Sequence, residues 1–122
     1  MTRFKSQGFG NTFKNARKGF RLVVRSEMNI RVHLVIAILV LILAYLLNFS
    51  AVEYSILLLA IAIVIVSEML NTAIEFTLDA IYHNRYSKMV GMAKDISAGA
   101  VMFASFISVL IGLFLFGSHI FR

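Results

Sequence analysis

Residues 32–52 read VHLVIAILVLILAYLLNFSAV, an uncharged run of 21 residues interrupted only by the neutral or weakly basic His33. A second uncharged run, residues 96–118, is very rich in Phe, Leu, Ile and Val. About 20 apolar residues, each rising ~1.5 Å along a helix, cross the ~30 Å hydrocarbon core of a bilayer. Both runs therefore predict transmembrane helices.

The middle of the chain predicts a third span of unusual composition. Residues 54–67 are uncharged, but 14 residues are short for a span. Extending the run to Ile74 gives the required length only by including Glu68, and Glu75 and Asp79 follow. The sequence thus predicts an all-α membrane protein of one domain, residues 1–122. Its expected elements are a surface helix at about 9–30 and spans at about 32–52, 54–76 and 96–117.

The composition also favours lipid surroundings. Of the 122 residues, 60% are hydrophobic and 15% are charged, whereas a soluble domain is about half apolar and a quarter charged. Such hydrophobicity excludes intrinsic disorder. The absence of cysteine excludes a disulfide scaffold, a thiolate nucleophile and a Cys-ligated metal site. The absence of proline fits long unbroken helices.

The basic residues are unevenly distributed and predict the orientation. Segment 1–31 holds eight of the 12 Lys and Arg residues, the turn near 48–53 holds none, and the loop 79–95 holds three. Basic loops stay on the cytoplasmic side of a membrane. We therefore expect a multi-pass protein of the bacterial inner (cytoplasmic) membrane, with the N-terminus inside and the C-terminus outside.

Residues 9–30 have the pattern of an amphipathic helix. The apolar stripe comprises Phe9, Phe13, Ala16, Phe20 and Val24, and the basic flank comprises Lys14, Arg17, Lys18, Arg21 and Arg25. The pattern fits a helix lying in the interface of an anionic membrane, and equally a helix packed on the bundle outside it. A basic face could in principle bind nucleic acid. Beside three spans we expect the flank, Arg17 included, to meet lipid phosphates or a nucleotide instead.

Five polar residues of the middle span share one helical stripe. They are Glu68, Asn71, Thr72, Glu75 and Asp79. An acidic residue at the centre of a membrane helix costs roughly 2.5–3.5 kcal/mol, so such residues face protein, water or a bound cation. Oxygen ligands without His or Cys suit Mg²⁺. Alternatively, Glu75 and Asp79 lie in a wet helix end and pair with Arg31 or Lys94.

Glu27 and the Lys94–Asp95 pair are further charged residues of the cytoplasmic side. Glu27 follows Phe9 by 18 residues and so falls on the apolar stripe of the surface helix. It either pairs with Arg31 or joins Glu75 around a cation. Asp95 is placed to cap the last span and Lys94 to snorkel at its boundary; alternatively, the pair offers an ammonium and an acceptor to a nucleotide. His33 and His119 are isolated, which is more typical of interface positions than of metal ligands.

The segment Glu68-Met-Leu-Asn71-Thr72-Ala-Ile-Glu75, with Ala93-Lys94-Asp95 and the small turn Ser97-Ala-Gly-Ala100, resembles the prokaryotic diacylglycerol kinase family. The resemblance covers nearly the whole chain. It implies a homotrimer that phosphorylates lipid alcohols with MgATP at active sites shared between neighbouring subunits. By position it also implies roles for six residues: Glu68 as the catalytic base, Glu27 and Glu75 as magnesium ligands, and Asn71, Lys94 and Asp95 as residues that hold nucleotide and substrate.

The lipid substrate stays open between two alcohols. Asn29-Ile-Arg31-Val-His33 resembles the pattern of family members that prefer undecaprenol to diacylglycerol, and Asn15 stands where some diacylglycerol-specific members have an aromatic residue. The resemblance therefore favours undecaprenol. A function from another class, a small oligomeric proton-coupled transporter, also uses a membrane-embedded Glu. Such transporters, however, resemble four short spans with that Glu in the first.

Overall fold

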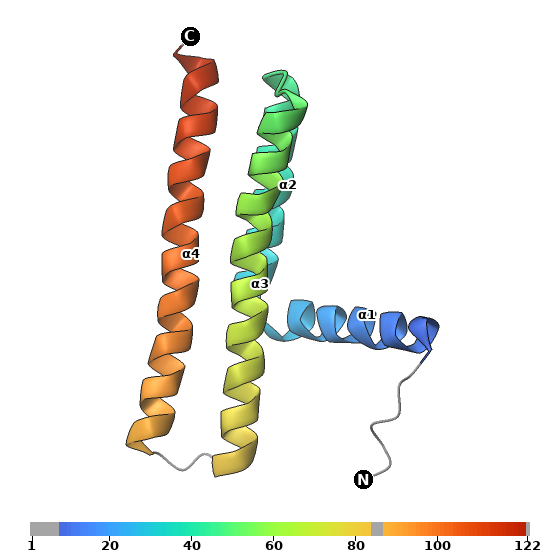
Figure 1. Cartoon of the computed structure of the whole chain (residues 1–122), viewed down its shortest axis with the longest axis vertical. Coiled ribbons are helices and arrows are strands. Elements are labelled where there is room, and N and C mark those ends of the chain that lie inside the picture. Colours follow the sequence, from blue (N-terminus) through green and yellow to red (C-terminus); the bar gives the residue numbers. More distant parts are fainter. Residues whose placement is uncertain (1–7, 84–86, 122) are drawn as a thin grey trace.

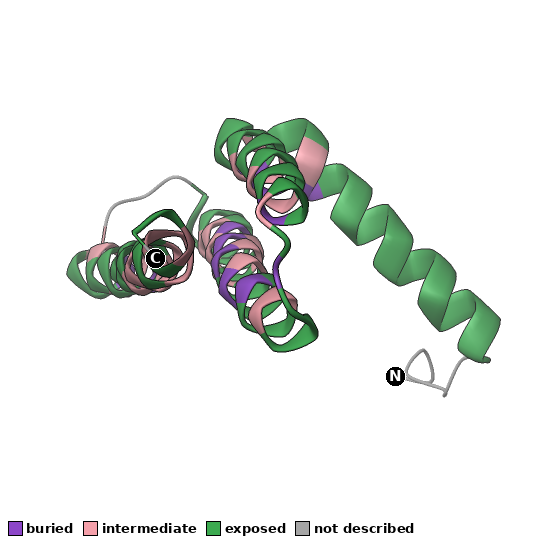
Figure 2. Cartoon of the chain, turned by 90° about the horizontal axis from the view of Figure 1, so that it is seen from above, coloured by how far each residue is buried: buried purple, intermediate pink, exposed green. Residues whose placement is uncertain are grey.

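The computed structural model describes residues 8–83 and 87–121, which form four α-helices. In chain order they are α1 (Phe9–Ser26), α2 (Met28–Leu46), α3 (Ala51–Tyr82) and α4 (Lys88–Ile120). Helices α2, α3 and α4 run side by side with α3 between the other two, and α1 leaves the bundle sideways (Figures 1 and 2). The predicted all-helical class is confirmed.

Three of these helices are long and apolar enough to cross a membrane. They are α2, α3 and α4, with 19, 32 and 33 residues. At ~1.5 Å per residue, α3 and α4 are about 48 Å and 50 Å long, which exceeds the ~30 Å hydrocarbon core. The charged end of the α3–α4 pair, which carries Asp79 and Lys94, is therefore the part best placed outside that core.

The connection between α2 and α3 lies earlier in the chain than the sequence pattern suggests. The span expected over 32–52 ends at Leu46, and Asn48 adopts a left-handed conformation with φ of 59°. The hydroxyl of Ser50 then accepts a hydrogen bond from the N–H of Glu53 at 3.2 Å, while the Glu53 carboxylate accepts one from the N–H of Ser50 at 2.9 Å. This reciprocal capping box starts α3 at Ala51. An uncharged run alone does not reveal such a turn.

The surface helix is shorter than the expected 9–30. It ends at Ser26, and Glu27 is extended, with φ of −119° and ψ of 115°. The guanidinium of Arg31 donates hydrogen bonds of 2.8 Å to the carbonyls of Val24 and Arg25, which satisfies acceptors that the end of a helix leaves unpaired. Within the described residues, Arg31 forms no ion pair with Glu27, so that alternative is not supported.

The last helix begins earlier than expected. Its N-cap is Ser87, and Lys88 is its first residue. Asp95 therefore lies two turns inside α4, and the interpretation of Asp95 as an N-cap is wrong. The uncharged run that suggested it marks where the helix becomes apolar, not where it begins.

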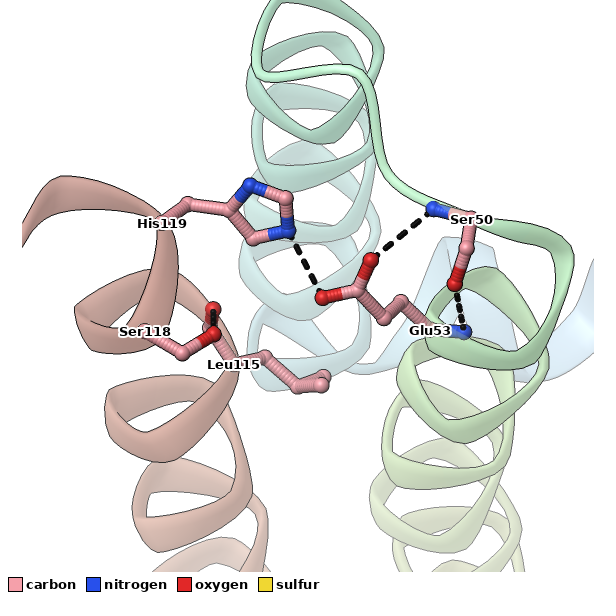
Figure 3. A network of polar contacts seen from close by, with 5 residues as sticks. All are labelled: Ser50, Glu53, Leu115, Ser118 and His119. Atoms are coloured by element: carbon pink, nitrogen blue, oxygen red, sulfur yellow. Dashed lines mark hydrogen bonds and ion pairs between the residues drawn. The ribbon is translucent and has the colours of Figure 1, made fainter. Parts of the chain in front are cut away.

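One end of the bundle is tied together by a group that we call the turn cluster: Phe49, Ser50, Glu53, Phe116 and His119. Phe49 is buried; its ring stacks on His119 with centroids 4.6 Å apart and packs against Phe116 at 4.9 Å. Nε2 of His119 lies 2.6 Å from Oε2 of Glu53 (Figure 3). These contacts join the C-terminal end of α4 to the start of α3.

Candidate active site

Glu68 is a buried carboxylate in the middle of the bundle. It lies on α3 and is only 5% exposed, although carboxylates are almost never fully buried without a partner. Oε1 of Glu68 lies 3.4 Å from Nε2 of His33 on α2, whose side chain is 29% exposed. The expected embedded carboxylate is therefore enclosed by protein within a single chain, beside an imidazole that can share or exchange a proton with it.

A second set of polar contacts runs from α4 to the same face of α3. The hydroxyl of Ser97 donates to Oδ1 of Asn71 at 2.6 Å, and Nδ2 of Asn71 donates to Oε1 of Glu75 at 2.8 Å. Ser97 and Thr72, which flank this contact, are buried. The chain of two hydrogen bonds fixes the Asn71 amide and holds the Glu75 carboxylate by one of its two oxygens.

Asp79 and Lys94 form an ion pair nearer the end of the bundle. Nζ of Lys94 lies 2.7 Å from Oδ1 of Asp79, and both side chains are partly exposed, at 38% and 47%. This is the pairing expected if Asp79 lies in a wet helix end. Such exposed pairs contribute little to stability, so Lys94 could exchange this partner for a phosphate oxygen at small cost.

Glu27 and Glu75 lie at similar heights in the bundle. Helices α2 and α3 run in opposite directions and meet at His33 and Glu68. Glu27 precedes His33 by six residues and Glu75 follows Glu68 by seven, which places both about 9–10 Å from that level towards the same end. The structure thus brings the two predicted metal ligands to one level.

The donor chemistry of these two carboxylates fits magnesium. Glu27 is half-buried and has no ion pair among the described residues, and Glu75 has one oxygen engaged by Asn71. In residues 8–83 and 87–121 no three His, Asp or Glu side chains gather into a metal cluster. Mg²⁺ needs no such cluster, because it usually binds one or two carboxylates together with substrate phosphates and water.

Two predicted site residues are not brought to this group within one chain. Arg17 is exposed on α1, which projects away from the bundle (Figure 1). Asp95 is exposed on α4 and makes no ion pair in the described part of the chain. A role for either residue beside Glu68 requires a second copy or a bound ligand.

The sequence pattern did not identify two residues that the structure places at the site. His33 was expected to be an isolated interface residue, yet it lies against Glu68. Ser97 was interpreted as part of a small packing turn, yet it anchors Asn71. The available signal was position: both residues lie opposite their partners once α2, α3 and α4 fold back on one another.

Comparison with known proteins gives a consistent result. A sequence profile described as prokaryotic diacylglycerol kinase matches residues 14–116. An undecaprenol kinase of Bacillus subtilis (strain 168) is 38% identical over 108 residues, which cover 88% of this chain and 87% of that protein. A diacylglycerol kinase of Escherichia coli (strain K12) is 31% identical over 102 residues, 84% of this chain and 83% of that one. A diacylglycerol kinase of a Synechocystis species is 32% identical over 101 residues, which cover 83% of this chain but 58% of that protein.

Proposed function

The chain belongs to the prokaryotic diacylglycerol kinase family, and on that premise we propose that it is an ATP-dependent membrane lipid kinase. It transfers the γ-phosphoryl group of ATP to the hydroxyl of a lipid alcohol at the cytoplasmic face of the inner membrane. Family membership gives no support to the transporter alternative. The observation that supports the chemistry best is the buried Glu68 carboxylate beside His33.

Glu68 is the general base of the proposed reaction. Phosphoryl transfer needs the attacking oxygen to lose a proton, and a positioned carboxylate contributes typically 10²–10⁴-fold to such a step. Glu68 lies in the apolar part of α3, where a lipid can reach it while its chain stays in the bilayer. His33 holds the carboxylate in place and is positioned to receive the proton afterwards.

The groups on the α3–α4 side position the nucleotide. Glu27 and Glu75 would hold Mg²⁺, which when bound neutralises charge on the transferred phosphoryl group. Asn71, fixed by Ser97, orients the Glu75 carboxylate and offers its remaining donor to a phosphate oxygen. Lys94 turns from Asp79 towards the phosphates, and Asp95 and Arg17 bind nucleotide or substrate from a neighbouring copy.

A homotrimer with shared sites accounts for the residues that one chain leaves unassembled. Arg17 and Asp95 lie exposed. Large apolar side chains also cover the outside of the spanning helices, among them Phe103 at 67% and Phe114 at 77% exposed. Lipid and neighbouring subunits are the two surroundings that such a surface suits.

Undecaprenol is the favoured acceptor. The relative named undecaprenol kinase is more similar to this chain than the two relatives named diacylglycerol kinase. His33, the last residue of the Asn29–His33 pattern, also lies directly against Glu68.

The test is a phosphorylation assay on the purified protein with ATP, offering undecaprenol and diacylglycerol side by side, with Mg²⁺ and with a chelator. We expect phosphate transfer to both alcohols at most, faster to undecaprenol, and none with the chelator. Absence of transfer to any lipid alcohol would refute the proposal. Faster transfer to diacylglycerol would reverse the substrate assignment alone.

A further inference from the structure

An elongated apolar cavity of about 520 Å³ lies between α2, α3 and α4. Small residues from all three helices line it, including Ala37, Ala60 and Gly112, and His33 lies at one end. The hydroxyl of Ser108, which also lines it, is engaged by the carbonyl of Ala60 at 2.8 Å. The volume is typical of ligand pockets, which span roughly 300–1,000 Å³, and the lining suits hydrocarbon better than water.

The shape of the cavity separates two possible occupants. Its lining runs over residues 105–121 of α4, about 24 Å, and over residues 57–64 of α3, about 10 Å. Even over the shorter length, 520 Å³ leaves a cross-section of roughly 50 Å², and over the longer one roughly 20 Å². A helix about 10 Å across needs roughly 80 Å². The cavity is therefore too narrow for a helix of a second copy and suits an extended hydrocarbon chain.

The polar end of the cavity is shared with the candidate active site. His33 lines the cavity and lies 3.4 Å from the carboxylate of Glu68. An alcohol whose chain occupies the cavity thus presents its hydroxyl to Glu68. At the other end, Phe116 both lines the cavity and packs against Phe49 in the turn cluster, which keeps α4 close to α3 there (Figure 3 shows the neighbouring His119–Glu53 contact).

We propose that this cavity binds the chain of the lipid alcohol, and that its width selects a single-chain polyisoprenoid alcohol over a two-chain glycerolipid. The inference rests on the proposed function for the identity of the reacting group. The hydroxyl lies at His33 and Glu68, and the isoprene units next to it extend along α4 towards Gly112 and Gly117. A glycerolipid leaves at least one of its two chains outside the cavity.

The test narrows the cavity at Gly112 and uses Gly99 as a matched control. Both glycines lie on α4, and a Cβ added at either meets no heavy atom within 4 Å. Gly112 lines the cavity, whereas Gly99 is exposed and does not. The assay measures KM for geraniol, for undecaprenol and for ATP. Gly112→Leu should raise KM for undecaprenol about tenfold or more, the discrimination that one or two methylenes supply in an apolar pocket.

The short alcohol and the control separate the outcomes. KM for geraniol and for ATP should stay within about twofold in Gly112→Leu, and all three values should do so in Gly99→Leu, because geraniol ends before it reaches Gly112. Gly112→Ala should shift KM for undecaprenol in the same direction by less. An unchanged KM for undecaprenol overturns the proposal. Equal losses for geraniol and undecaprenol, or a changed oligomer size for Gly112→Leu alone, overturn it in favour of a packing role.

A binding measurement keeps this proposal separate from the kinase assignment. A long-chain alcohol carrying a diazirine in its chain is photolysed with the parent protein, and labelled peptides are mapped by mass spectrometry. Labelling should fall within residues 105–121 and drop severalfold in Gly112→Leu but not in Gly99→Leu. Labelling elsewhere overturns the cavity as the binding site. Labelling there in a protein that phosphorylates no lipid keeps the site and refutes the proposed function.

Discussion

Nε2 of His33 lies 3.4 Å from Oε1 of Glu68, across the contact between α2 and α3. The two residues are 35 positions apart in the sequence, and they meet because α2 and α3 fold back on each other at the Asn48 turn. The pair also marks a boundary. Towards one end lie the polar residues of the α3–α4 contact, and towards the other lies the apolar cavity.

Replacing the buried carboxylate tests its role as the base. Glu68→Gln keeps the size and hydrogen-bonding capacity of the side chain but cannot accept the proton. We expect kcat for lipid phosphorylation to fall by two to four orders of magnitude, roughly the contribution of general-base catalysis, with KM for ATP unchanged. The measurement is steady-state kinetics of the purified variant.

Glu53→Gln is the matched control, because this acidic residue lies on the same helix at the opposite end. It should keep kcat within about threefold of the parent. If Glu68→Gln turns over at a near-parental rate, Glu68 is not the base. If KM for ATP rises as steeply as kcat falls, Glu68 binds nucleotide instead.

The proposed metal ligands predict a change in magnesium dependence. Glu27→Gln and Glu75→Gln should each raise the Mg²⁺ concentration for half-maximal activity at least tenfold, because removal of a ligand or its orienting partner typically costs 10–100-fold in metal affinity. Excess Mg²⁺ should restore part of the rate. A variant with the parental Mg²⁺ dependence would show that its residue is structural.

Much of the fold follows from the sequence. The uncharged runs indicated three membrane helices, and three helices of suitable length and composition are present. Helix ends were less predictable, because α2 stops inside an uncharged run at a left-handed Asn48 and a Ser50–Glu53 capping box. Hydropathy is set by residue type, whereas a helix end is set by backbone conformation and local hydrogen bonds.

Contacts between helices follow from simple hairpin geometry. Asn71 with Ser97, Ala60 with Ser108 and Glu53 with His119 are all paired across α3 and α4. The midpoint of each pair falls at positions 84–86, between the ends of the two helices. Once the turn positions are known, these partners can be found from the sequence. What a single chain leaves apart, such as Arg17 and the Glu68 region, depends on other copies or ligands and is not readable from one sequence.

Lys94 and Asp79 predict unequal effects on nucleotide binding. If Lys94 holds phosphate, Lys94→Met should raise KM for ATP about tenfold or more, since a charged contact is lost. Asp79→Asn removes the partner in the 2.7 Å ion pair and should leave KM for ATP within about twofold. Equal effects of both variants would indicate that the pair acts only as a structural link between α3 and α4.

Ser97 is predicted to act through Asn71. Ser97→Ala removes the donor to Oδ1 of Asn71, so the amide that orients Glu75 becomes free to rotate. We expect KM for MgATP to rise about three- to tenfold, corresponding to one ordinary hydrogen bond, with the protein still folded. Ser118→Ala is the control, because Ser118 bonds only the carbonyl of Leu115 in its own helix; a similar shift there would discount the Ser97 result.

The turn cluster predicts a stability effect that is separate from catalysis. Phe49 is 7% exposed and contacts Tyr54, Phe116 and His119, so Phe49→Ala leaves a hole among buried rings and should lower the free energy of unfolding by about 3–5 kcal/mol. Phe103→Ala, at a side chain that is 67% exposed, should change it by less than about 0.5 kcal/mol. Reversible unfolding in detergent micelles measures both.

His119 variants divide the stacking contribution of the turn cluster from its ion pair. His119→Phe keeps a ring on Phe49 but cannot contact Glu53, whereas His119→Ala loses both contacts. We expect His119→Ala to unfold at a lower temperature than His119→Phe, and both at a lower temperature than the parent. KM for geraniol should stay parental in all three proteins, because the short alcohol ends far from this cluster. If His119→Phe is as unstable as His119→Ala, the ion pair with Glu53 contributes the stabilisation and the aromatic stack contributes none.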